Sequence, residues 1–241
     1  MLSEFKKISE YPILETPVTI RLGFYKKGAL QYISHLDLQR TFQRILSRAE
    51  LPLWYTQGFN PHPKLVFSLP LSLGAESMCE FLDIRVLPPV DYEKIKESLN
   101  KNLPDDIQVK RVYKPKTKLE DLCWSRYTFK LYFNGMSEEK ANEIKSMLET
   151  PMIITKRTKK TKSGLTDVDI LPGIKSSEVS FDGECVNISA DLESSVDNYI
   201  NPDYIIRALA KYLNIDFEQS GEYYTVMKEV TFKKDCKTVY Q

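Results

Sequence analysis

The chain has 241 residues, of which 42% are hydrophobic, so it is long enough to bury one large core or two ordinary ones. Its 34 Lys and Arg residues against 33 Asp and Glu residues give a net charge of +1, which excludes a global field that draws the whole protein onto nucleic acid or membrane. Any charged partner must therefore bind to a local patch of charged residues.

The four cysteines lie far apart, with no C-x-x-C pair and no histidine at metal-ligand spacing. We therefore expect free thiols, no bound metal and no cofactor. Residues 1–17 carry charges and no apolar segment of the kind found in a signal peptide, and no long uncharged apolar stretch follows. These features predict a cytoplasmic protein without a membrane partner.

The first half of the chain predicts a β-α-β-β-α-β order. Residues 19–33 have a strand-like pattern interrupted at Lys26-Lys27-Gly28, as two short strands or one bent strand. Ser34 stands at a helix N-cap position, and Asp37 completes a capping box before a helical apolar repeat that Pro52 ends. The remaining expected elements are extended segments at 53–55 and 65–69, a strand at 81–87, a helix after Asp91 and a strand at 107–113.

The second half predicts the same order after a lysine-rich connection. Its expected elements are a strand at 124–133, a helix at 137–149, strands at 152–156 and 186–192, a helix at 202–213 and a strand at 223–232. The sequence thus predicts an α+β protein of two tandem ferredoxin-like units with antiparallel sheets. The expected boundaries are an N-terminal extension 1–17, a first domain 18–114, a linker 115–122 and a second domain 123–241.

Two motifs carry a family resemblance: SHLDLQR at residues 34–40 and QGFNPHPK at residues 57–64. Together with the segments 67–70 and 80–84, they resemble the bacterial radical SAM-linked protein family. The resemblance implies a radical SAM protein as partner, of the kind that acts on RNA or ribosomal components. The chain itself lacks the C-x-x-x-C-x-x-C motif that holds the iron–sulfur cluster of a radical SAM enzyme, so a partner would perform any radical chemistry.

Both histidines lie in these motifs, and each is a candidate acid–base catalyst. Pro61 and Pro63 restrict the backbone around His62, so the loop presents its side chains with little entropy left to lose. We predict one surface site for an anionic ligand at the start of the first helix, formed by His35, Asp37, Arg40, Gln57, Asn60, His62 and Lys64. The alternative is purely structural, with His35 beside a helix cap and His62 in a turn that aligns two strands.

Two basic groups are candidate contacts for nucleic-acid phosphates. Arg40, Arg44 and Arg48 recur every four residues along one face of the first helix. The loop 156–164 contains five basic residues, Lys156, Arg157, Lys159, Lys160 and Lys162, and its composition is typical of a hairpin tip. Charged faces that are merely solvated remain the alternative for both.

No nucleophile elbow, phosphate-binding glycine loop or zinc-protease motif is present in the sequence. The leading hypothesis is therefore a noncatalytic RNA-binding or substrate-presenting accessory protein that works with a radical SAM enzyme. The alternatives are an RNA-processing or RNA-modifying enzyme that uses His35 or His62, and a protein–protein adaptor without a nucleic-acid role.

Overall fold

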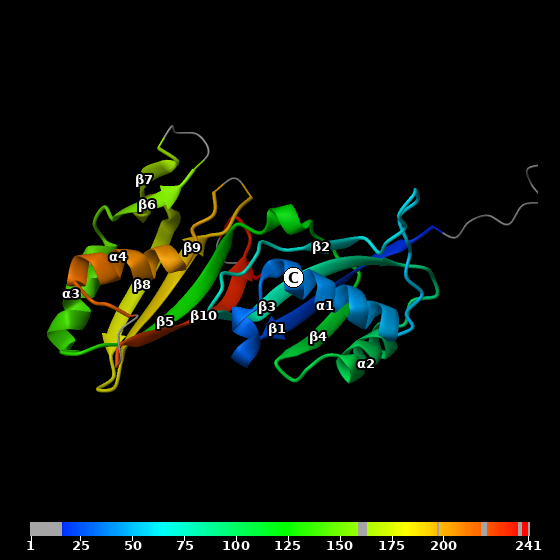
Figure 1. Cartoon of the computed structure of the whole chain (residues 1–241), viewed down its shortest axis with the longest axis horizontal. Helices are drawn as coiled ribbons and strands as arrows, with labels where there is room; N and C mark the ends of the chain where they lie inside the picture. Colours follow the sequence, from blue (N-terminus) through cyan, green and yellow to red (C-terminus); the bar gives the residue numbers. More distant parts are fainter. Residues whose placement is uncertain (1–15, 159–162, 197, 218–220, 236–237, 241) are drawn as a thin grey trace, which may run out of the picture.

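A computed structural model describes residues 16–158, 163–196, 198–217, 221–235 and 238–240. They form a mixed α+β structure with a mostly antiparallel sheet and, within these ranges, four α-helices (Figure 1). None of the helices in these ranges is both long and apolar enough to cross a membrane.

The first half follows the predicted order closely. Its elements are β1 (Val18–Lys26), α1 (His35–Arg48), β2 (Leu65–Phe67), β3 (Ala75–Val86), α2 (Tyr92–Asn102) and β4 (Ile107–Tyr113). Ser34 and Asp91 are the N-caps, as predicted: Ser34 Oγ accepts from the Asp37 N–H at 3.1 Å, and the Asp91 carboxylate accepts from the Lys94 N–H at 3.1 Å. The predicted capping box is not formed in the expected way, because the Asp37 carboxylate accepts from the Ser34 hydroxyl. The side chains of α1 and α2 pack with β1, β3 and β4 around one apolar core.

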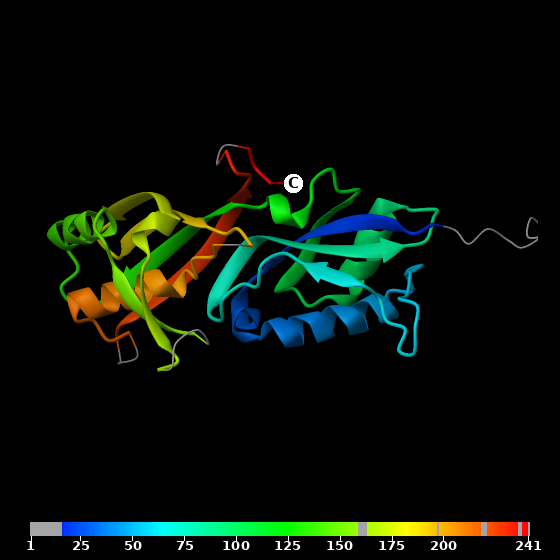
Figure 2. The same ribbon diagram turned by 90° about the horizontal axis from the view of Figure 1, so that it is seen from above.

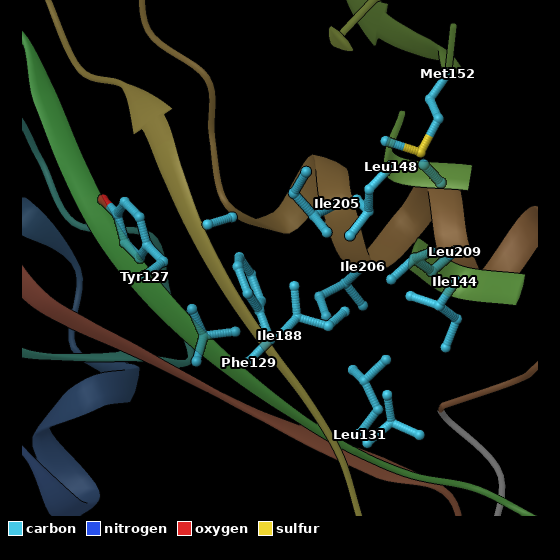
Figure 3. Close-up of a cluster of buried hydrophobic side chains, with 14 of the residues drawn as sticks. Tyr127, Phe129, Leu131, Ile144, Leu148, Met152, Ile188, Ile205, Ile206 and Leu209 are labelled. Carbon is cyan, nitrogen blue, oxygen red and sulfur yellow. The ribbon is translucent and has the colours of Figure 1, made fainter. Parts of the chain in front are cut away.

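The second half contains β5 (Trp124–Tyr132), α3 (Glu138–Leu148), β8 (Ile174–Phe181), β9 (Val186–Glu193), α4 (Asp203–Leu213) and β10 (Tyr223–Phe232). A separate hairpin of β6 (Ile153–Arg157) and β7 (Leu165–Asp169) is inserted between α3 and β8. Figure 3 shows the core of this half, where Tyr127, Phe129 and Ile188 of the sheet face Ile144 of α3 and Ile206 of α4.

One sheet runs through both halves, in the order β4-β1-β3-β10-β5-β9-β8. The prediction of separate sheets is therefore wrong. The join is short and parallel: Ala75 to Ser77 of β3 lie beside Val226 to Lys228 of β10. β1 pairs with Ser77 to Val86 along one edge of β3. β2 and β10 share the other edge, β2 at Leu82 to Ile84 and β10 at Ala75 to Ser77.

Three further expectations need correction. Gly28–Tyr32 is a 3-10 helix and not a second strand, because Gly28 adopts φ +57 and its N–H bonds the Glu76 carboxylate at 2.6 Å. Residues 53 and 55 form only isolated bridges, to Val86 and Pro63. The segment predicted at 152–156 is β6, which pairs only with β7, and its predicted place in the sheet is taken by β8.

Candidate functional site

The start of α1 is organised by a local network of polar side chains. The Ser34 hydroxyl donates to the Asp37 carboxylate at 2.7 Å, and Arg40 contacts the same carboxylate at 3.3 Å. The hydrogen bond from Ser34, aided by the charge of Arg40, lowers the pKa of Asp37 below its ordinary value. Asp37 is thus an anion in the first turn of the helix, where it contacts the cap residue Ser34 and orients Arg40.

The arginine stripe lies on the exposed face of α1, as the helical spacing predicts. Arg40, Arg44 and Arg48 are all exposed and border a shallow groove of about 530 Å³ that Gln43 and Ser47 complete. Arg40 is partly neutralised by Asp37, whereas Arg44 and Arg48 form no ion pair within the described ranges. Two fully charged guanidinium groups therefore face solvent along one side of α1.

The loop 57–64 is a closed hairpin whose ends are held together by backbone pairing. Tyr55 and Pro63 form a bridge, the Thr56 N–H donates to the His62 carbonyl at 2.9 Å, and the His62 N–H donates to Thr56 Oγ1 at 3.2 Å. Beyond these contacts, Phe59 projects fully into solvent, with a relative exposure of 112%. An exposed aromatic ring at the tip of a constrained loop is a ready surface for stacking.

His62 is held in one orientation by this loop. Its Nδ1 lies 2.8 Å from the Asn60 carbonyl oxygen, which only accepts hydrogen bonds, so Nδ1 carries the hydrogen. Neutral His62 then offers Nε2 as an acceptor, and Nε2 has no hydrogen-bond partner within the described part of the chain. His62, Asn60 and Pro61 form one wall of a groove of about 480 Å³ whose other wall is Gln39, Gln43 and Ser47 of α1.

His35 lies elsewhere. Its ring meets Phe67 edge-on, at 5.3 Å between centroids, and it borders a small cavity together with Lys26, Ser68 and Glu80. The two histidines therefore do not share a pocket, and the expectation of a single site around them is wrong. The cause is geometric: the pairing of Tyr55 with Pro63 and of Leu53 with Val86 places the loop beside the middle and later turns of α1, away from its first turn.

The remaining predicted residues are also dispersed. Gln57 is exposed and makes no side-chain hydrogen bond within the described ranges, and Lys64 borders a cavity on the opposite face of the sheet. Lys156 and Arg157 end strand β6 of the predicted hairpin. Lys159, Lys160 and Lys162 lie outside the described residues.

A buried polar cluster that the sequence does not predict lies at the join between the halves. Lys228 Nζ on β10 lies 2.9 Å from Glu80 Oε1 on β3, and Ser77 Oγ donates to the same oxygen at 2.7 Å. Burial lowers the pKa of Lys228, but the carboxylate of Glu80, together with Cys79 and Tyr199, outweighs it, so the pKa is raised. Burial also lowers the pKa of Lys26, whose Nζ lies 3.5 Å from the Gln31 carbonyl oxygen.

One signal for this cluster was available in the sequence. Glu80 and Lys228 are each flanked by residues of a strongly apolar strand, at positions that alternation assigns to a buried face. Nothing in the sequence, however, indicates that the two strands are neighbours. Within the described ranges, no group of three or more His, Cys, Asp or Glu side chains is placed to hold a metal ion.

Comparisons with known proteins place this geometry in context. Among solved structures, the chain is similar to one chain of a Cbf5-Nop10-Gar1 complex, with 12% identity, a TM-score of 0.45, and coverage of 91% of this chain and 52% of that one. It is also similar to a chain of the archaeal box H/ACA sRNP Nop10-Cbf5 complex, with 13% identity, a TM-score of 0.42, and coverage of 96% and 54%. A third match, to an unknown protein from Galdieria sulphuraria, has 10% identity and a TM-score of 0.27, covering 88% of this chain and 99% of that one.

The chain spans about half the length of the chains that it matches in the two complexes. TM-scores and identities this low give no basis for transferring a function. No curated protein matches the sequence. A family model, in contrast, matches residues 19–202, which include both motifs, α1, the loop 57–64 and the hairpin of β6 and β7. The chain therefore belongs to the family described as "Uncharacterized protein conserved in bacteria (DUF2344)".

Proposed function

We propose that the chain is a noncatalytic RNA-binding accessory protein, and that it holds single-stranded RNA along the exposed face of α1 and the loop 57–64. One observation carries the proposal. The three exposed arginines of α1 border a groove that shares the lining residues Gln43 and Ser47 with the groove beside Asn60 and His62.

The residue types of this face suit the parts of an RNA strand. Arginine side chains bind phosphates and release the counterions condensed on the strand. Amide side chains such as Gln39 and Gln43, and the free Nε2 of His62, are able to hydrogen-bond the edges of unpaired bases. The exposed ring of Phe59 offers a stacking platform at the end of the same loop.

The proposal extends to the partner and to the architecture. The motifs at 34–40 and 57–64 resemble the radical SAM-linked family, so we propose a radical SAM enzyme as the partner that performs the chemistry. We also propose that the chain consists of two ferredoxin-like units, residues 18–114 and 123–241, joined by 115–122. The strand orders of the two units, β4-β1-β3-β2 and β10-β5-β9-β8, support this. Numbered along the chain within each unit, the fourth strand lies beside the first, and the third strand lies between the first and the second.

The test is RNA binding measured by fluorescence anisotropy with a labelled single-stranded oligonucleotide over a range of salt concentrations. The triple variant R40Q/R44Q/R48Q should bind more weakly and lose up to about 0.7 from the salt slope for each phosphate contact removed. The matched control K94Q/K96Q/K101Q removes the same charge from α2 and should leave the slope unchanged. Equal slopes for the wild type and the α1 variant would remove this face from the site.

The same samples separate the alternatives. An accessory protein leaves the bound RNA intact, whereas an enzyme that uses a histidine converts it and loses this conversion in H35A or H62A. Mass spectrometry of the RNA after incubation distinguishes these outcomes. A protein–protein adaptor binds no RNA at any salt concentration tested.

A further inference from the structure

The face of the sheet opposite α1 carries a second, larger cavity. Ile20, Leu22 and Ile84 point into the core beneath the helices, so the residues that alternate with them face the other side. Figure 2 shows α1 on one side of the sheet and the connection between β4 and β5, with the C-terminal residues, on the other. The cavity of about 690 Å³ lies between this connection and Arg21, Val66 and Asp83 of the sheet.

A buried network fixes the connection in place over the sheet. Arg21 is 1% exposed and makes a two-pronged ion pair with Asp83, at 2.6 and 2.8 Å. The same guanidinium donates to the Thr117 carbonyl at 3.0 Å and to the Tyr240 hydroxyl at 2.6 Å, and this hydroxyl donates to the Lys118 carbonyl at 2.6 Å. The cavity is therefore held open by satisfied buried polar groups, as a preorganised binding site requires.

The walls of the cavity carry an excess of positive charge. Two of its three carboxylates are already engaged, Asp83 by Arg21 and Asp121 by the Lys118 N–H at 2.8 Å. Four cations line the walls and form no ion pair within the described ranges, Lys64, Arg85, Lys116 and Lys118. Of these, Arg85 is the most enclosed, and its guanidinium lies over the Trp54 ring at 5.1 Å, which fixes its position.

Apart from the carboxylate of Glu120, the remaining lining is apolar or carries hydroxyl groups. Val66 is 41% exposed although it lies on a strand, and Pro115 and Leu119 face it from the connection. Thr19 and Thr117 contribute hydroxyl groups, and Glu120 contributes an acceptor. A lining of this kind, in a cavity within the usual range for small-molecule sites, suits a ligand with both an anionic group and a ring.

We propose that this cavity binds a phosphorylated small molecule of mononucleotide size, with its phosphates against the cluster of Lys64, Arg85, Lys116 and Lys118. The cations match phosphate oxygens, and the apolar surface of Val66, Pro115 and Leu119 matches a base or sugar face. The site does not depend on RNA binding at α1. Lys64 ends the loop 57–64, so one loop contributes to both faces of the sheet.

The test is isothermal titration calorimetry with the four ribonucleoside 5′-monophosphates and 5′-triphosphates as probes, and with adenosine and inorganic pyrophosphate as controls. At least one nucleotide should bind, adenosine should not, and pyrophosphate should bind more weakly than the best nucleotide. R85Q and K116Q should each weaken the binding of that nucleotide by roughly tenfold or more, which is the effect of one lost charge-assisted contact. Lys116 is exposed, so K116Q should fold like the wild type. Its result therefore tests the site even if R85Q fails to fold.

Three results would overturn the proposal: no nucleotide binds at millimolar concentration, pyrophosphate binds as tightly as the best nucleotide, or R85Q and K116Q keep the wild-type affinity. The variant R40Q/R44Q/R48Q separates this site from the RNA-binding face. It should keep nucleotide affinity, because α1 lies on the other side of the sheet. A loss of nucleotide affinity in that variant would place the ligand at α1 and also contradict the inference.

Discussion

Lys228 and Glu80 form an ion pair at 2.9 Å with side-chain exposures of 4% and 7%, and they belong to two strands that join the halves of the sheet. A pair this deeply buried is costly to break, because the remaining charge keeps its desolvation penalty. We expect K228M to lower the free energy of unfolding by about 3–5 kcal/mol, measured by urea denaturation.

Two variants sharpen this prediction. The double variant E80M/K228M removes both charges and should recover much of the loss. K140M removes one partner of the exposed Lys140–Glu143 pair, with exposures of 42% and 49%, and should cost well under about 1 kcal/mol. If K228M is no more destabilising than K140M, the buried pair has no role in joining the halves.

The thiol of Cys79 should resist alkylation. Burial raises its pKa to about 11, so at pH 8 about one molecule in a thousand carries the thiolate. We expect iodoacetamide at pH 8 to label Cys123 before Cys79, as followed by mass spectrometry of the peptides, with Cys79 labelling faster as the pH rises. Early labelling of Cys79 in the folded protein would contradict its position on β3, where its thiol lies 4.0 Å from the Lys228 carbonyl oxygen of β10.

Asp191 should contribute to stability at neutral pH and lose that contribution in acid. Its burial raises its pKa, but Arg126, at 2.8 Å from each carboxylate oxygen, and Ser176, at 2.9 Å, together hold the pKa below the ordinary value of 3.8. A depressed folded pKa means that the stabilisation is complete above the unfolded value and disappears as the pH falls through the folded one.

Urea denaturation between pH 6 and about pH 2 checks this. D191N should be less stable than the wild type at pH 6, and the difference should shrink below about pH 4. D105N, which changes an exposed carboxylate after α2, should show no such convergence. A constant difference between D191N and wild type across the range would exclude the linkage.

Tyr240 should stabilise both the fold and the cavity beneath the connection. Its hydroxyl accepts from Arg21 and donates to the Lys118 carbonyl, each at 2.6 Å, so Y240F leaves a part-buried carbonyl and part of a buried guanidinium without this partner. We expect a loss of about 1–3 kcal/mol in unfolding free energy and faster amide hydrogen exchange in residues 115–121. Y25F, which loses one exposed hydrogen bond at 3.1 Å, is the matched control and should change neither quantity measurably.

The local elements were predictable from the sequence because their signals are local. Ser34 and Asp91 cap α1 and α2 as expected, and β4 and β10 have the predicted bounds. Strand β8 was not predicted, because it is an edge strand whose alternation of apolar and polar residues is interrupted by a register shift between Ile174 and Ser176. Four polar residues in its first five weaken the apolar pattern further.

Long-range relationships were not predictable. The join between β3 and β10 consists of three residue pairs, and neither strand carries a sequence signal for a partner in the other half. The arginine stripe on α1 was found because helical spacing alone defines it. The separation of His35 from His62 was not predicted, because it depends on where two isolated bridges place the loop along the helix.

The shared edge of β3 also has a consequence for synthesis on the ribosome. Glu80 precedes Lys228 by 148 residues, which at about 5–20 residues per second is a delay of roughly 7–30 s. During this interval the start of β3 is an open strand edge, and the carboxylate of Glu80 lacks its counterion and must remain hydrated. The first half therefore emerges as an incomplete sheet whose open edge is exposed to neighbouring chains until β10 arrives.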